Sequence, residues 1–286
     1  VIVSAVHPMF FERAFGITST RVAARAVAMF GSSNGAGPCI YALKQDIDMN
    51  SATIRAPSCG IISNGIMNLN SDNITAASIG AVGQINVNSS TFPEASPSVG
   101  IAASDPCPTV ASCAYLTSNP PATSPCTYSN LSLNSWTGTL SPGVYCQSVN
   151  MNSCTVTLQP GLYVFTNGLN TNSTTLNGSG VTLYIAQSSL NANSSTFNLN
   201  SPTTGNYAGM LVYQPTSNNS RANLNSSGSS DIRGAIYMPT GTLTTNSTFD
   251  NWVLIVTGDI HMNSSTVNVP ANSAFAGSPR HGYLAE

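Results

Sequence analysis

The residues that could carry out hydrolysis or elimination are few in this sequence. Cleavage of a glycosidic bond uses two carboxyl groups that flank the bond, and lyases of acidic sugars use acids clustered with Lys or Arg. Asp46 and Asp48 form the one close pair of acids in the repeated part of the chain, and on a strand they would share a face. Asp48, however, occupies a position that asparagine holds in related segments, so we interpret it as structural.

The histidines do not complete a catalytic set either. His261 holds the same repeated position as Asp48, His7 precedes a proline, and His281 lies near the end of the chain, so no Ser/His/Asp arrangement can be nominated. Asp231, Arg233, Asp250 and Asp259 fall in different repeats, and there is no EF-hand loop or acid-rich nonapeptide. We therefore expect a protein without enzymatic activity, catalytic residues, cofactor or metal.

Composition narrows the class of protein further. Only 6% of residues are charged, against roughly 25% in ordinary globular domains, and the net charge is −2. A chain without a basic patch is a poor ligand for nucleic acid, and no apolar stretch reaches the length of a membrane span. Because 41% of residues are hydrophobic and evenly interspersed, the chain can bury a core. An ordered, secreted or surface protein with a neutral polar exterior is expected.

A short phrase, Asn-Ser-x-Thr-apolar, recurs along the chain. It begins at Asn50, Asn88, Asn152, Asn172, Asn193 and Asn263, with a near copy at Asn70. A polar residue two positions upstream and an apolar residue between give the alternation of a strand with one buried face. The phrase returns after about 20 residues, a unit too small to bury its own core, so successive units must stack.

This repeat predicts an all-β fold, a right-handed parallel β-helix (solenoid) with about 20 residues per coil. We expect the seven asparagines to form a structural ladder along the axis. We also expect asparagine to take the corner of each coil, because it tolerates left-handed backbone angles. The aromatic side chains of the apolar strands between the phrases, such as Tyr163, Phe165 and Tyr213, are expected in the core.

Three other segments flank or interrupt the solenoid, which we place at 39–286. Residues 1–30 form a strand-rich N-terminal arm, and 31–38 are a Gly/Ser linker. A Pro/Cys-rich insertion interrupts the repeats at about 93–145. The arm is apolar and is the candidate for pairing with a sheet edge in an assembly, through Val1, Ile2, Val3, Phe10, Phe11 and Phe15.

The seven cysteines lie in polar or turn-like contexts without a zinc-ligand spacing, so disulfides in an oxidising compartment are expected. Sequence does not fix their connectivity. The arrangement we expect is Cys39–Cys59, Cys107–Cys113 and Cys126–Cys146. An odd number leaves at least one thiol free or paired with another chain.

Several segments resemble the TadG-like proteins of bacterial tight-adherence (Flp) pilus systems. They are the arm from Val6 to Ile17 with Val22–Ala28, the run Leu140-Ser-Pro-Gly-Val-Tyr-Cys146 through Leu158-Gln-Pro-Gly-Leu-Tyr163, and the ending Leu284-Ala-Glu286. The resemblance implies a bacterial envelope location and a role in attachment or filament assembly without catalysis. The family usually has an N-terminal transmembrane helix, which this sequence lacks. Because the chain begins with Val1, we expect export through an upstream leader or anchor.

The leading hypothesis is a non-enzymatic structural or adhesive protein of the bacterial surface. It would be a homo-oligomer or filament subunit whose arm pairs strands between subunits, alone or with other pilus-assembly proteins. The alternative is a surface-binding solenoid such as an ice-binding module, because ladders of Thr, Ser and Asn with little charge suit that surface. A polysaccharide-degrading β-helix enzyme is a third possibility without candidate residues.

Overall fold

The computed structural model describes residues 2–8, 19–25, 37–93, 95–226, 229–250 and 254–269, which fall into two compact units, 1–30 and 31–286. In the first, β1 (Ile2–Pro8) pairs antiparallel with β2 (Ser19–Arg25). Ile2 and Val3 of the expected assembly residues lie on β1. Val1, Phe10, Phe11 and Phe15 lie outside the described residues, as does linker segment 31–36.

The second unit is a parallel β-solenoid of about 11 coils spaced about 20 residues apart, which confirms the predicted fold class. Each coil contributes strands to three faces, and side chains alternate between the interior and the exterior. In the strand Leu169–Asn172, for example, Leu169 and Thr171 are buried and Asn172 is exposed. The interior is a single stack of apolar side chains that extends through the coils.

The first face carries the recurring asparagines and is called the asparagine face. In order along the stack, its strands are β8 (Ile85–Asn88), β6 (Met67–Asn70), β4 (Ile47–Asn50), the second half of β27 (Leu254–Asn263), the second half of β25 (Ala235–Thr245), β23 (Ala222–Asn225), β20 (Leu190–Asn193), β17 (Leu169–Asn172), β14 (Val149–Asn152) and β11 (Ser132–Asn134).

The second face carries outward threonines and is called the threonine face. Its strands are the first halves of β7 (Asn73–Ala81) and β5 (Thr53–Ser63), then β28 (Thr266–Asn268), β26 (Thr248–Asp250), β24 (Ser230–Arg233), β21 (Thr196–Asn200), β18 (Thr175–Ser179), β15 (Thr155–Leu158) and β12 (Thr137–Leu140).

The third face, the strap face, is covered by a segment that passes along the stack. Its strands are β9 (Pro97–Val99), the second halves of β7 and β5, β3 (Pro38–Ala42), the first halves of β27 and β25, β22 (Met210–Tyr213), β19 (Val181–Ile185), β16 (Gly161–Phe165), β13 (Gly143–Cys146) and β10 (Tyr128–Ser129).

The covering strap is residues 100–127, with the 3-10 turn η2 (Cys107–Thr109) and helix α1 (Ala111–Ser118). The predicted insertion at 93–145 therefore extended too far, because the coils resume at β10. The strap also contains a helix, which was not predicted. The strap is fixed by hydrogen bonds between Asn64 and Ala103 (2.8 and 2.9 Å) and between Thr117 Oγ1 and the Tyr213 hydroxyl (2.8 Å). On the strap face, β19, β22 and the first halves of β25 and β27 are buried at every position.

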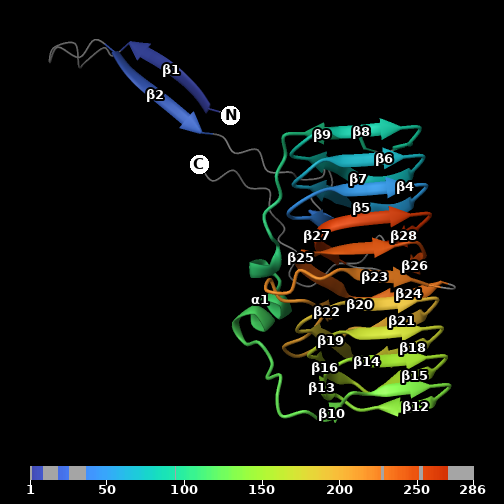
Figure 1. Cartoon of the computed structure of the whole chain (residues 1–286). Helices are drawn as coiled ribbons and strands as arrows, with labels where there is room; N and C mark the ends of the chain where they lie inside the picture. The colour runs from blue at the N-terminus through green and yellow to red at the C-terminus, as the bar shows by residue number, and fades with distance from the viewer. Residues whose placement is uncertain are drawn as a thin grey trace. The chain divides into compact units, whose positions relative to one another are not determined.

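Coils do not stack in chain order. The first coil of the solenoid, formed by β3, β4 and β5, lies in the middle of the stack. From there the chain runs to the β8 end, crosses along the strap to the β12 end, and returns coil by coil to the middle. There β27 and β28 pair with β3, β4 and β5, and Figure 1 shows the blue and red strands side by side. This join, called the seam, is hydrogen-bonded like any other step, as in Leu43 N to Thr257 O (2.8 Å) and Ser264 N to Asn50 O (2.8 Å).

The expected disulfides Cys39–Cys59, Cys107–Cys113 and Cys126–Cys146 are those that the structure contains, and Cys154 is a buried free thiol. Three disulfides fit an extracellular protein. In the described part of the chain, no helix is long and apolar enough to span a bilayer.

In the coils that carry the repeated phrase, the corner is taken by its serine rather than by its asparagine, which corrects the expectation. Ser51, Ser153 and Ser173 have φ of 55°, 53° and 49°, and Ser71, Ser89, Ser194 and Ser264 behave alike. The asparagine is the last strand residue before the turn. The serine amide donates to the asparagine carbonyl of the adjacent coil, as in Ser153 N to Asn172 O (2.9 Å), so stacking stabilises the left-handed residue.

The residue after each corner serine turns inward and forms a second, buried ladder. The Ala52 amide donates to Asp72 Oδ1 (2.7 Å), the Asp72 amide donates to Ser90 Oγ (2.9 Å), and the Cys154 amide donates to Thr174 Oγ1 (3.3 Å). Four other coils have a hydroxyl residue here (Ser90, Thr174, Ser195 and Ser265), whereas Asp72 is an acid with only 2% of its surface exposed. Burial raises the pKa of Asp72, and the hydrogen bonds from Ala52 and Ser90 offset this only in part.

We predict that wild type loses stability relative to Asp72→Ser as the pH rises. A carboxyl whose pKa is raised by folding binds its proton more tightly in the folded state, so its stabilising effect is complete at low pH and is lost as pH rises through the folded-state pKa. Serine keeps an acceptor for the Ala52 amide without the charge. The measurement is the difference in unfolding free energy between the two proteins from about pH 3 to about pH 7, a range that covers an ordinary Asp pKa of about 3.9. A difference that does not change with pH would contradict this assignment.

Candidate functional site

Charged side chains gather at the seam and make structural pairs there. His261 lies between two carboxylates, with Nδ1 3.2 Å from Asp48 Oδ2 and Nε2 2.9 Å from Asp259 Oδ2. Asp48 and Asp259 belong to coils on opposite sides of the seam, so the imidazole bridges the join. Asp46, the other member of the sequence-nominated pair, donates its amide to Asp259 Oδ1 (3.1 Å). Among the described residues, no group of three or more His, Cys, Asp or Glu side chains is arranged to hold a metal ion.

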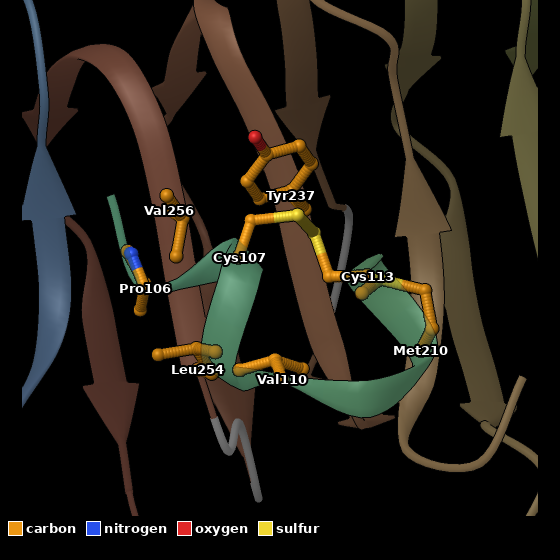
Figure 2. A pocket seen from close by; sticks show the side chains of 8 residues that line it. All are labelled: Pro106, Cys107, Val110, Cys113, Met210, Tyr237, Leu254 and Val256. Atoms are coloured by element: carbon orange, nitrogen blue, oxygen red, sulfur yellow. A yellow bond between two sulfur atoms is a disulfide. The ribbon is translucent and has the colours of Figure 1, made fainter. Parts of the chain in front are cut away.

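A small recess lies where η2 and α1 meet the strap face (Figure 2). It is lined by Pro106, Cys107, Val110, Cys113, Met210, Tyr237, Leu254 and Val256. The Tyr237 hydroxyl donates to Asp105 Oδ2 (2.8 Å). Burial, then this contact with Asp105, raises the pKa of Tyr237, so the phenol stays protonated. The recess is therefore a packing contact between the strap and the strap face.

The aromatic residues divide between two environments. Tyr163 and Phe165 point into the core, as expected. Tyr184, Tyr213 and Tyr237 instead form a stacked column on the strap face, with ring centroids 5.4 and 5.2 Å apart. The strap covers this column, so it is not an exposed platform for a sugar ring.

The asparagine face is a self-satisfied surface. The repeated asparagines lie in two groups along the stack. The coils toward the β8 end carry Asn50, Asn70, Asn88 and Asn263, and the coils toward the β12 end carry Asn152, Asn172 and Asn193. Five of these amides donate to the oxygen of an asparagine in the adjacent coil, as in Asn70 to Asn50 (3.1 Å) and Asn193 to Asn172 (3.3 Å); the others are Asn50, Asn88 and Asn152. A second column of asparagines, two residues upstream on the same strands, forms hydrogen bonds of the same kind, as in Asn191 to Asn170 (2.9 Å). These side chains spend much of their hydrogen-bonding capacity on one another.

The threonine face is different, because its hydroxyl groups are left to solvent. Over β12, β15, β18 and β21 its outward positions are Thr137, Thr139, Thr155, Thr157, Thr175, Asn177, Thr196 and Asn198. Within the described residues, none of these six threonine hydroxyls makes a hydrogen bond to another protein group. Positions repeat about every 4.8 Å across coils and about 6.7 Å along each strand, which gives a regular two-dimensional array.

This part of the threonine face is also uncharged. The sequence contains no Asp, Glu, Lys, Arg or His from 106 through 220, a range that includes all four of these strands. On the same face nearer the seam the outward positions include Asp231, Asp250 and Arg55. The neutral hydroxyl array therefore covers one half of the solenoid, and it is the candidate functional surface.

The asparagine column contains the residues of the predicted ladder, whereas the threonine array contains no predicted site residue. The signal was present, since the Asn-Ser-x-Thr phrases at Asn50, Asn152, Asn172, Asn193 and Asn263 each end in the threonine that begins a threonine-face strand. A further copy at Asn134-Ser-Trp-Thr137 was missed because glycine follows instead of an apolar residue. It belongs to the coil that was assigned to the insertion.

Comparisons with known proteins give little. No family model matches this chain, and no curated protein matches it. A solved structure similar to it is an ice-binding protein from the Antarctic ascomycete Antarctomyces psychrotrophicus, at 12% identity and a TM-score of 0.37, with 84% of this chain and 98% of that chain covered. A match at this level carries no argument about function, so the proposal below rests on the faces of the solenoid.

Proposed function

We propose that the protein is a non-catalytic binding module that adsorbs to an extended, ordered surface of water, namely ice, through the neutral part of its threonine face. The observation that carries the proposal is the array of unpaired threonine hydroxyls on β12, β15, β18 and β21. A hydroxyl paired with a methyl group presents both a hydrogen-bonding group and an apolar contact at each lattice point.

Rigidity and neutrality support the same proposal. The backbone hydrogen bonds between coils fix the array before binding, so little conformational entropy is lost on adsorption. A charged side chain would keep its own hydration shell and disturb ordered water beside it, and such side chains are missing from 106 to 220. A regular array of exposed groups suits the repeating lattice of a crystal plane, whereas an enzyme needs a concave pocket with convergent polar groups.

We predict that Thr157→Lys abolishes most of the ice-binding activity. The exposed ammonium would stand in the middle of the array, break its spacing and hold competing water. Thermal hysteresis and ice-crystal shaping of the purified protein should fall several-fold, while the melting temperature stays near that of wild type because Thr157 is exposed.

The matched control is Ser118→Lys, which adds the same charge at the end of α1 on the strap. It should retain wild-type thermal hysteresis. Equal losses in the two variants would assign the effect to net charge instead of the array. Wild-type protein without thermal hysteresis or ice shaping would exclude the proposal.

A second candidate is a structural or adhesive role at the bacterial surface, with the arm as the attachment element. The observation that favours it is the β1–β2 hairpin in a compact unit of its own. A two-stranded hairpin is marginally stable in water, so it gains stability by adding to a sheet edge of a surface protein. Three disulfides suit export.

Deletion of 1–30 tests this role. We expect the shortened protein to keep its melting temperature, since the solenoid is a separate compact unit, and to be released from the cell surface into the medium. Immunoblots of the surface and medium fractions measure the outcome. Surface retention equal to that of the full chain would count against the arm as the attachment element.

A further inference from the structure

Within the described residues, no further coil covers either end of the solenoid. At the β8 end, Val87 continues the inward column of Met49 and Leu69, yet 49% of its surface is exposed against 1% for Leu69. Val99 continues the column of Ala81 and is 63% exposed against 0%. These are core positions that lack a covering coil.

The opposite end is formed by β10, β11 and β12 and is also apolar. Tyr128 and Leu133 continue the inward columns of Tyr145 and Met151, and they are only partly buried. Gly138 occupies an inward position, and the indole of Trp136 lies where a Gly138 side chain would be. The end therefore presents tyrosine, leucine and tryptophan side chains.

Both ends also expose strand edges. In the described part of the chain, β8 and β9 pair only with β6 and β7, and β10, β11 and β12 pair only with β13, β14 and β15. Charged residues commonly protect exposed strand edges against pairing. None of these five end strands carries one. Because all coils run the same way, the β12 end of one copy meets the β8 end of another in parallel orientation.

The seam shows that coils of this chain stack without being consecutive. There β27 pairs with β4 in the register Ile260 with Ile47 through Asn263 with Asn50, a separation of 213 residues. An end-to-end contact between copies would repeat this arrangement: backbone ladder, inward apolar column and outward asparagine column.

We propose that the protein associates head to tail, the β8 end of one copy stacking on the β12 end of a second copy, so that the solenoid continues through a filament. The contact is heterologous and does not close, so it extends in one dimension. It is a separate surface from the arm and from the threonine face, and it does not depend on the proposed function.

The test uses two full-length variants, Val87→Lys at one end and Leu133→Lys at the other. Sedimentation velocity over a concentration series should show wild type as a growing set of end-to-end oligomers and each variant alone as a monomer. An equimolar mixture of the two should form dimers and nothing larger. In the mixture one intact β12 end meets one intact β8 end, and both outer ends of the dimer are blocked.

The control is Ser118→Lys, which lies away from both ends and should associate as wild type does. Melting temperatures near that of wild type show that the variants are folded. Wild type that stays monomeric throughout the series overturns the proposal. So does a variant that still forms long oligomers, or a folded mixture that stays monomeric, because association would then use another surface.

Discussion

Parallel hydrogen bonding between successive coils is the constraint on which the rest of this structure depends. A coil of about 20 residues cannot bury a core alone, so each residue is stabilised by the same position one coil away. The corner serines illustrate this dependence, because Ser153 holds a left-handed backbone while its amide is bonded to Asn172 of the adjacent coil. Columns, faces and a continuous apolar interior all follow from this one spacing.

The same spacing gives the two exposed faces opposite properties. Strands lie about 4.8 Å apart, farther than a hydrogen bond of about 2.9 Å. An asparagine amide extends far enough from the backbone to bridge the gap and carries both donor and acceptor, so Asn191 reaches Asn170. The threonine hydroxyl sits directly on Cβ and stays close to its own strand, so Thr155 and Thr175 remain unpaired in register. Side-chain length therefore separates a surface that satisfies itself from one that offers its groups to a ligand.

Much of the fold was predictable, because the Asn-Ser-x-Thr phrase reports coil length and face together. The strap was not, since Ala111–Ser118 sits among prolines and cysteines and has no amphipathic pattern. The corner residue was assigned to asparagine on intrinsic backbone preference, whereas the ladder holds asparagine in the strand and leaves the turn to serine. The candidate surface was missed because a hydroxyl stays without a partner only for a certain strand register and side-chain length. Residue types alone do not give the register.

The order of the coils was also beyond the sequence, and the reason bears on assembly. A repeat makes its units interchangeable, so the period is the same whichever coil lies next. The distinguishing residues are charged, and they cluster where the chain closes on itself: His261 bridges Asp48 and Asp259 across the seam. Such contacts contribute little energy at the surface but penalise wrong partners, since a carboxylate in another register would lose its imidazole partner. The end strands carry no such ionisable residues. They retain only the backbone hydrogen-bonding groups and inward apolar side chains that let one coil stack on another.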